Sequence, residues 1–465
     1  MNLARHSISS TAPVLIFDTR FDADCQIFTT STQAGFAVYN TWPLKLIRKR
    51  EITGGTLAAV VPLHTSSLLF LLGGGRSPRY PPNKVILWDD AIGQEVVELE
   101  FRERVRGLAC RRGWLAVALR RRVVVFQMDT SVSRFAEWDT SDNPRGLLAL
   151  ATAAHSTLLV IPGRQMGHVQ LIHLSPCEPP QPLGPPPPTL PKPPPPVSQH
   201  HVSIIAAHTT ALTTLSVPPS GRLLATTSSR GTLVRIWDTS TGKLVRELRR
   251  GTDKAEIYGV AFRPDEREVC VWSDKGTVHV FALDGGSGLS NRHSTLSPLT
   301  SYLPLPKYFE SEWSYAQYRI PAQSSHISLS APASKPPTAD VVDEEKCIVG
   351  WIRGPVSDDE DHDTLSATEH QLVALTYTGG WYRLSLPTSG TSSNVINTPT
   401  PVAPSPLSGS PPSVTALSMR RPRSSSGSSF TGRPGKGKER EKEGKESREC
   451  ILKEYRRYGR WDGWG

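Results

Sequence analysis

The chain has 465 residues, of which 41 are proline and 36 are glycine, and 37% are hydrophobic. This composition argues against one uniformly packed unit and favours a globular part interrupted by disordered insertions. The six cysteines are widely scattered without a CxxC pair and follow no recognisable signal peptide, so a reducing, cytosolic setting is expected. No apolar run approaches the roughly 20 residues that span a bilayer, so any membrane contact is expected to be peripheral.

The net charge of +10 is unevenly distributed. Residues 415–465 hold 14 Lys or Arg and 7 Asp or Glu in a Ser-, Gly- and Pro-rich segment. The rest of the chain is therefore close to neutral, and an anion site within it must be local. Nucleic-acid binding through this tail is an alternative function. A disordered, solubilising tail is the simpler interpretation, and no nucleic-acid partner is expected.

One short pattern recurs along the chain: a β-rich stretch that ends in an aromatic or aliphatic residue, often followed by a polar turn. Its seven copies are FAVYNTWPLKLI (36–47), VILWDDAIGQEVVEL (85–99), VVVFQMDTSVSRFAEW (123–138), VQLIHL (169–174), VRIWDTSTGKLVREL (234–248), VHVFALDG (278–285) and WYRLSL (381–386). The shorter spacings match the about 40 to 45 residues of a four-stranded propeller blade. Spaced short strands also fit a β-sandwich, but the repeat period favours a propeller.

The sequence thus predicts an all-β fold, a seven-bladed β-propeller over residues 13–386. Its first strand, 13–21, is expected to close the ring against the last blade. Insertions are expected at a Pro-rich segment (176–200), a Gly/Ser/Leu/Pro segment (284–306), and low-complexity or acidic segments (321–340 and 355–369). Residues 387–465 are expected to form a disordered basic tail.

The stretch LVRELRRGTDKAEIYGV (244–260) places Arg249 beside Arg250, directly before Gly251. Successive side chains of a strand point to opposite faces, so the two guanidiniums are expected to enter two different pockets between blades. Each guanidinium offers a fork of donors suited to phosphate oxygens. Hydroxyls and imidazoles on either side of the pair could complete each phosphate shell. The simpler alternative is two solvated charges at a strand end.

The LRRG motif at 248–251 resembles the Phe/Leu-Arg-Arg-Gly signature of the PROPPINs, β-propellers that bind polyphosphoinositides. Further similar stretches include ATTSSRGTLVRIWDT, SDKGTVHVFAL and PPNKVILWDD, the last resembling the subgroup of the fourth human paralogue and the yeast homologue of the vacuole-swelling protein. The resemblance implies two sites, for phosphatidylinositol 3-phosphate and phosphatidylinositol 3,5-bisphosphate. The first would use His208, Thr226, Ser228, Gly231, Thr232, Arg235 and Arg249. The second would use Arg250, Gly251, Ser273, Thr277 and His279, with Gly251 as a shared backbone hinge. Trp272, which stands where relatives usually have a small residue, is expected to reshape the second site.

The insertion after VHVFAL carries apolar residues suited to dipping into a membrane interface, and the family's corresponding loop does this. The residues of this predicted membrane loop are Leu296, Leu299, Tyr302 and Leu303. An ordinary loop packed on the propeller is the alternative. By resemblance, the autophagy lipid-transfer protein would bind through the early blades, where Asp22 and Asp24 occupy a predicted exposed turn or are simply turn formers.

No nucleophile, general base or metal-ligand spacing is recognisable, so an enzyme is not expected, nor a cofactor or metal. The resulting hypothesis is a monomeric, non-catalytic adaptor that reads phosphoinositides. It would be cytoplasmic and peripheral on preautophagosomal, endosomal and vacuolar membranes. The competing hypothesis is a WD-repeat protein-interaction scaffold without lipid binding.

Overall fold

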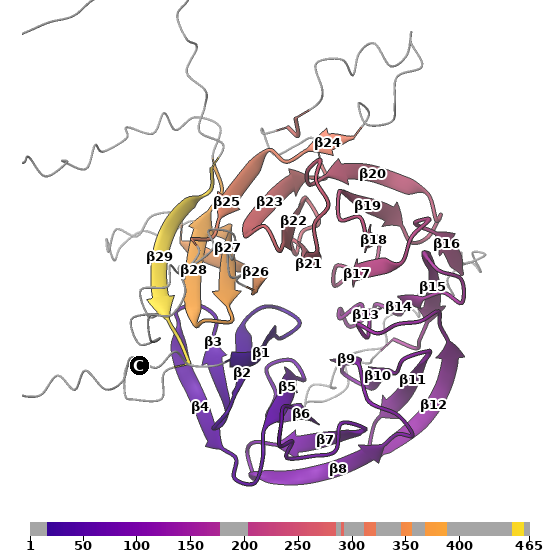
Figure 1. Ribbon diagram of the computed structural model, residues 1–465, viewed down its shortest axis with the longest axis vertical. Coiled ribbons are helices and arrows are strands. Elements are labelled where there is room, and N and C mark those ends of the chain that lie inside the picture. The colour runs from indigo at the N-terminus through magenta and orange to yellow at the C-terminus, as the bar shows by residue number, and fades with distance from the viewer. Residues whose placement is uncertain are drawn as a thin grey trace, which may run out of the picture. The chain divides into compact units, whose positions relative to one another are not determined.

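The computed structural model describes residues 16–176, 203–284, 290–292, 311–321, 346–355, 368–387 and 449–459. The regular elements in these ranges are β-strands, and they form seven sheets arranged around a ring (Figure 1). The predicted all-β, seven-bladed propeller is therefore confirmed. Within the same ranges, no helix has the length and apolar character needed to cross a membrane.

The first four blades follow the chain in simple order, each with four antiparallel strands. Blade 1 contains β1 (Ile16–Phe21), β2 (Ile27–Thr32), β3 (Gly35–Asn40) and β4 (Lys45–Glu51). Blade 2 contains β5 (Leu57–Pro62), β6 (Leu68–Gly73), β7 (Lys84–Asp89) and β8 (Gln94–Glu100). Blade 3 contains β9 (Gly107–Arg111), β10 (Trp114–Ala118), β11 (Arg122–Met128) and β12 (Val132–Asp139). Blade 4 contains β13 (Ala149–Leu150), β14 (Leu158–Pro162), β15 (His168–His173) and β16 (Ile204–Ala206).

The last three blades are built from segments that are farther apart in the sequence. Blade 5 contains β17 (Leu212–Ser216), β18 (Leu223–Ser228), β19 (Leu233–Asp238), β20 (Leu244–Arg249) and a fifth, parallel strand, β24 (Glu312–Trp313). Blade 6 contains β21 (Ile257–Phe262), β22 (Glu268–Ser273), β23 (Thr277–Ala282) and β25 (Ala316–Arg319). Blade 7 contains β26 (Cys347–Pro355), β27 (Thr368–Thr376), β28 (Gly380–Ser385) and β29 (Ile451–Arg457).

The seven sequence repeats coincide with one position in the blade. Each copy contains the third strand of its sheet, namely β3, β7, β11, β15, β19, β23 and β28. This strand pairs with a neighbour on each side and carries buried apolar residues in every blade. The buried apolar residues of the third strand, often followed by a polar turn, are the recurring pattern that the sequence shows.

The predicted boundary at residue 387 is wrong. The strand β29 completes blade 7 by pairing with β28, where Ile451 is the register partner of Ser385. The residues on either side of β29, Cys450 and Tyr458, are buried, and the Tyr458 hydroxyl donates to the carbonyl oxygen of Thr376 at 2.6 Å. Residues 449–459 therefore belong to the propeller. The insertion that precedes them separates the two strands of one hairpin by more than 60 residues, and local periodicity does not detect such a pair.

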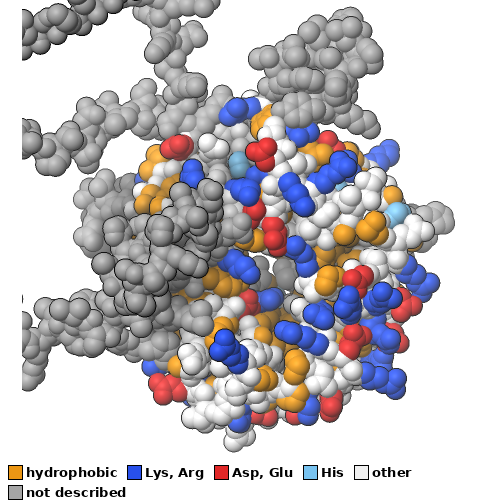
Figure 2. Space-filling view, viewed as in Figure 1, with side chains coloured by type: hydrophobic (Ala, Val, Ile, Leu, Met, Phe, Trp, Pro, Cys, Tyr) orange, Lys and Arg blue, Asp and Glu red, His pale blue; other side chains and the backbone are white. Residues whose placement is uncertain are grey.

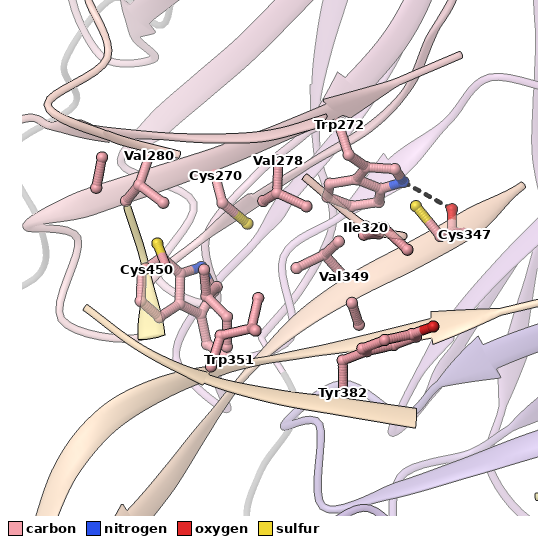
Figure 3. Packing of buried hydrophobic residues seen from close by; sticks show 14 of the residues in the cluster. Cys270, Trp272, Val278, Val280, Ile320, Cys347, Val349, Trp351, Tyr382 and Cys450 are labelled. Carbon is pink, nitrogen blue, oxygen red and sulfur yellow. Dashed lines mark hydrogen bonds between the residues drawn. The ribbon is translucent and has the colours of Figure 1, made fainter. Parts of the chain in front are cut away.

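The ring closes by packing between the first and last blades. The strand β1 pairs with β2 inside blade 1 and shares no sheet with blade 7. Ile16 and Phe28 of blade 1 instead pack with Trp381 of blade 7 in one buried cluster. The indole Nε1 of Trp381 donates to the carbonyl oxygen of Thr41 at 3.1 Å. The first strand thus contributes to closure through side chains, as interblade cores do around the rest of the ring (Figure 3).

We predict that ending the chain after residue 387 destabilises the propeller, because blade 7 then lacks its outer strand and exposes an unpaired edge. Urea denaturation should show a lower transition midpoint, or loss of a single cooperative transition, relative to the full chain. The matched control replaces residues 388–448 by a five-residue Gly/Ser linker. Because Ser385 and Ile451 are register partners, a short turn can join the two strands. Equal stability of the truncated and linker chains would contradict this prediction.

Candidate functional site

The arginine pair lies at the end of the strand β20 in blade 5. Arg249 is the last residue of this strand, Arg250 follows it, and the two residues are 8% and 7% exposed. The preceding residue, Leu248, is fully buried against blade 6. Because neighbours in a strand alternate, Arg249 faces the blade 4 side and Arg250 is directed toward blade 6. Arg249 Nε donates to Ser311 Oγ at 2.9 Å, whereas Arg250 Nε donates to the carbonyl oxygen of Gly231 at 3.0 Å.

The register of blade 5 brings four predicted first-site residues onto one face. Thr226 on β18 is the partner of Arg235 on β19, and Arg235 is the partner of Glu247 on β20. One step nearer the strand ends, Ser228 and Arg249 lie in the next row on the same face. Arg235 donates from Nε to Glu247 Oε2 at 3.0 Å. Sequence reasoning missed Glu247, although it stands two residues before Arg249 and alternation places it on this face.

Two of the predicted first-site residues belong to the supporting structure. His208 Nε2 and Thr226 Oγ1 are 3.0 Å apart, and Trp237 Nε1 donates to the same hydroxyl at 2.9 Å. Thr226 is completely buried, so a ligand cannot touch it in this arrangement. Burial and the nearby charge of Arg235 lower the pKa of His208 to about 4. His208 is therefore neutral near pH 7 and supports the site without adding charge to it.

The turn between β18 and β19 accepts hydrogen bonds from Arg250. Gly231 has a φ of +62°, and a Cβ there would lie 1.7 Å from the carbonyl oxygen of Ala255, so only glycine fits. Its carbonyl oxygen and that of Thr232 accept hydrogen bonds from the side chain and the backbone of Arg250. The assignment of Gly231 to the first site is corrected accordingly. At Gly251 a Cβ would meet nothing within 4 Å and φ lies outside the left-handed region, so this position does not itself require glycine.

The predicted second-site residues of blade 6 face blade 5. Ser273 and Thr277 flank the β22–β23 turn, and His279 lies one row further along the same face. The charge of Arg250 reaches this face, since burial and Arg250 together lower the pKa of His279 to about 4. The half-buried imidazole contacts Ser314, with 3.2 Å between Nδ1 and Oγ. Burial also lowers the pKa of Arg250, and the charges of Asp274 and Asp253 oppose this shift.

Sequence reasoning missed Arg319, which lies beside the predicted second-site residues. Arg319, the exposed last residue of β25, is the register partner of Thr277 and therefore lies in the row of Ser273. It occupies the same place in blade 6 that Arg249 occupies in blade 5. The signal for Arg319 was its position at the end of a fourth strand, but the insertion after β23 hid that relation.

Trp272 does not enter the second site, which corrects the sequence-based expectation. Its side chain packs in the core between blades 6 and 7, where Nε1 donates to the carbonyl oxygen of Cys347 at 2.8 Å (Figure 3). Alternation explains this direction, since Trp272 and Ser273 must point to opposite faces of β22.

The two carboxylates predicted to bind a partner, Asp22 and Asp24, have different surroundings in the structure. Asp24 is exposed, whereas Asp22 is buried and accepts a hydrogen bond on Oδ1 from the backbone N–H of Ile27 at 3.0 Å. Burial raises the pKa of Asp22 to about 6. Asp22 is thus a turn former, and the prediction that it is exposed to a partner is wrong. The predicted membrane-loop residues Leu296, Leu299, Tyr302 and Leu303 lie outside the described residues.

Guanidiniums, hydroxyls and neutral imidazoles gather between blades 4, 5 and 6, and these groups suit an oxyanion. Carboxylates lie among them, since Glu247 pairs with Arg235 and the charges of Asp253 and Asp274 reach Arg250. Figure 2 shows Lys and Arg side chains distributed over much of the visible face with Asp and Glu among them, so the surface charge alone does not single out these blades. In the described part of the chain, no group of three or more His, Cys, Asp or Glu side chains is placed to hold a metal ion.

The fold and site thus define a seven-bladed β-propeller with an arginine pair between hydroxyl-bearing blade faces. The PROPPIN family model matches residues 196–325, which include the pair. The chain is 32% identical over 319 residues to SVP1-like protein 2 of Pichia angusta, covering 67% of this chain and 83% of that protein. It is 32% identical over 307 residues to Autophagy-related protein 18e of Arabidopsis thaliana, covering 65% and 75%.

The chain belongs to the PROPPIN family, as its sequence indicated. Its fold also matches the crystal structure of Hsv2 from Kluyvelomyces marxianus, with a TM-score of 0.56 and 20% identity over 82% of this chain and 94% of that one.

We predict that stability falls between pH 7 and pH 5 in part because of His208. The unfolded imidazole takes up a proton near its ordinary pKa of 6.5, whereas the folded one resists protonation until about pH 4. Acid therefore favours the unfolded state in this window, by roughly 1 to 2 kcal/mol at pH 5. Urea denaturation at both pH values should show a flatter dependence for His208→Gln. The exposed control His155→Gln should keep the wild-type slope, and equal slopes for all three chains would contradict the prediction.

Proposed function

We propose that this protein is a non-catalytic adaptor that binds phosphatidylinositol 3-phosphate and phosphatidylinositol 3,5-bisphosphate through two sites beside its arginine pair. The observation that carries the proposal is the opposite direction of two adjacent buried guanidiniums at one strand end. Arg249 lies in the same row of blade 5 as Ser228, and Arg250 faces Ser273 and Thr277 of blade 6. Two sites on one rim suit a bilayer, because a surface that presents both headgroups turns modest affinities into avidity.

Membership of the PROPPIN family supports an autophagy role, and so does similarity to a protein named autophagy-related. We extend the proposal to peripheral binding at preautophagosomal, endosomal and vacuolar membranes from the cytoplasm. The elongated lipid-transfer protein of autophagosome growth is the proposed partner. Of the two carboxylates first considered for that contact, exposed Asp24 is the one available to it.

A second candidate, a WD-repeat scaffold without lipid binding, is favoured by a specific observation. Both guanidiniums already have protein partners: Arg249 bonds Ser311, and Arg250 bonds the carbonyl oxygens of Gly231 and Asp253. In a scaffold, these contacts would be the entire role of the pair. In the adaptor, a phosphate would join or replace them.

Liposome flotation separates the two candidates. Arg249→Thr/Arg250→Thr should reduce flotation on vesicles containing phosphatidylinositol 3-phosphate by about tenfold or more, since each lost charge-assisted hydrogen bond weakens binding by 1.5 to 3 kcal/mol. The charge-matched control is Arg134→Thr/Arg164→Thr, which removes two exposed arginines on blades 3 and 4. If Arg249→Thr/Arg250→Thr floats as well as the wild type, or if no chain floats, the result would favour the scaffold.

Arg319 allows a test of the second site alone. We predict that Arg319→Gln weakens binding of soluble inositol 1,3,5-trisphosphate at one of two sites by several-fold and leaves the other unchanged, because only the blade 6 row contains this residue. Titration calorimetry on the full chain measures both sites. The control Arg267→Gln removes an exposed arginine elsewhere in blade 6. A uniform change at both sites, or none, would contradict the assignment of Arg319.

A further inference from the structure

The last residue of the fourth strand occupies the same position in every blade. In each case it is the register partner of the first residue of the third strand, so these residues form one row around the rim. From blade 1 to blade 7 the row reads Glu51, Glu100, Asp139, Ala206, Arg249, Arg319 and Arg457. Blades 1 to 3 thus end in carboxylates, and blades 5 to 7 end in guanidiniums. We call the three blades with arginine the basic arc.

The basic arc extends beyond the two candidate anion sites to the outer strand of blade 7. This strand, β29, lies beside β25 of blade 6 and runs in the same direction, since Gln317 and Glu449 form a parallel bridge (Figure 1). The backbone N–H of Cys450 donates to the carbonyl oxygen of Gln317 at 2.9 Å. Arg319 and Arg457 therefore end neighbouring strands at the same end of the rim.

The strand β29 presents both apolar and basic side chains to its surroundings. Leu452 and Tyr455 are 42% and 44% exposed. Their register partners, Leu384 and Tyr382, lie in the core between blades 6 and 7, so Leu452 and Tyr455 point to the blade 6 side of the strand. The exposed basic residues of the strand are Lys453, Arg456 and Arg457. Exposed leucine and tyrosine among basic residues suit the interface of an anionic membrane.

The carboxylates near β29 leave this charge on the rim. Glu454 contacts the buried Arg383, with 3.2 Å between Oε2 and Nε, and also pairs with Arg456. Glu449 lies at the opposite end of the strand from Arg457. Among the described residues, Lys453 has no carboxylate partner.

Two other outer strands show how β29 differs from the rest of the rim. The corresponding strand of blade 2, β8, carries three glutamates and no basic residue. The outer strand of blade 1, β4, is also basic, but Arg48 and Arg50 contact Asp90, and Lys49 contacts Glu51. The rim is therefore acidic at blade 2 and basic at blade 7.

Blade 7 does not repeat the arginine pair of blade 5. Arg250 follows the last residue of β20, whereas Ile320 follows the last residue of β25. Ile320 is buried in the core between blades 6 and 7. An apolar side chain fills the place where a guanidinium would meet a headgroup. The groups on β29 are suited to contact a lipid surface rather than to enclose a third headgroup.

We propose that β29 is a third contact with an anionic lipid surface, so that the membrane-facing edge of the propeller covers blades 5, 6 and 7. This inference rests on the proposed phosphoinositide function. Leu452 and Tyr455 enter the interfacial region, and the basic side chains of β29 attract anionic lipids around the bound phosphoinositides. Blades 2 and 3 lie opposite blade 6 in the ring, so their terminal carboxylates then point away from the membrane, where they are not repelled.

Flotation of the full chain tests this contact on phosphatidylcholine vesicles that contain phosphatidylinositol 3-phosphate, with and without phosphatidylserine. Lys453→Gln/Arg457→Gln should weaken binding to the phosphatidylserine vesicles by about tenfold or more, because each basic group near an anionic surface strengthens binding by about fivefold. Its calorimetric affinity for soluble inositol 1,3-bisphosphate should equal that of the wild type. The matched control is Arg122→Gln/Arg134→Gln, which removes two exposed charges on blade 3.

The outcomes separate this inference from the function on which it rests. An equal loss in both double variants, or no loss in either, would overturn the contact and leave headgroup binding intact. A wild type that binds neither the vesicles nor inositol 1,3-bisphosphate would overturn the proposed function and the contact together.

Hydrogen exchange of the wild-type chain on the same vesicles tests the contact without a substitution. Backbone amides of residues 451–457 should exchange more slowly on the vesicles, whereas those of residues 94–100 in β8 should be unchanged. Equal slowing in both strands, or none in β29, would overturn the contact. Slowing in β29 that appears without vesicles and grows with protein concentration would show that a second copy of the chain covers this strand, and would also overturn the contact.

Discussion

The burial of Leu248 is the constraint on which the site depends. This side chain is fully buried in the core between blades 5 and 6 and directly precedes the arginine pair. Because strand neighbours alternate, burying Leu248 toward blade 6 directs Arg249 to the other face and Arg250 back toward blade 6. A one-residue slip of β20 would turn Leu248 away from this core and exchange the faces of the two guanidiniums. The packing energy of one leucine thus fixes the geometry of two charged groups.

The direction of Arg250 determines which groups neighbour its charge. Its hydrogen bonds go to the backbone carbonyl oxygens of Gly231 and Asp253, and among the described residues it forms no direct ion pair. The carbonyls solvate the guanidinium without cancelling its charge. Arg235 differs, because Glu247 neutralises it directly. Of these two cations, Arg250 is the one without a carboxylate in direct contact, although the charges of Asp274 and Asp253 reach it. The neutral His279 on the facing strand adds a hydrogen-bonding group without repulsion.

The sequence predicted the parts of the fold that repeat and missed those that depend on distant pairing. The third strands carried a strong local pattern, so the blade count followed from them. The strand β29 and the two-residue strand β24 each pair with a strand across an insertion, so neither produced a local signal. For the same reason Arg319 was not recognised. The sequence pattern placed the Thr226 hydroxyl near the arginines. Only the structure shows that this hydroxyl already accepts a hydrogen bond from Trp237 Nε1.

The route of the chain through blades 5 and 6 explains why these sites lie where they do. The chain leaves blade 6 after β23, adds β24 to blade 5, and returns as β25 of blade 6. Tyr315 secures the return, since its hydroxyl donates to buried Glu268 at 2.7 Å and its N–H donates to the carbonyl oxygen of Val280. The two blades are therefore joined by backbone hydrogen bonds as well as by side-chain packing at this rim. This connection fixes the spacing between the two candidate anion sites, and avidity for a surface that presents two ligands depends on such a fixed spacing.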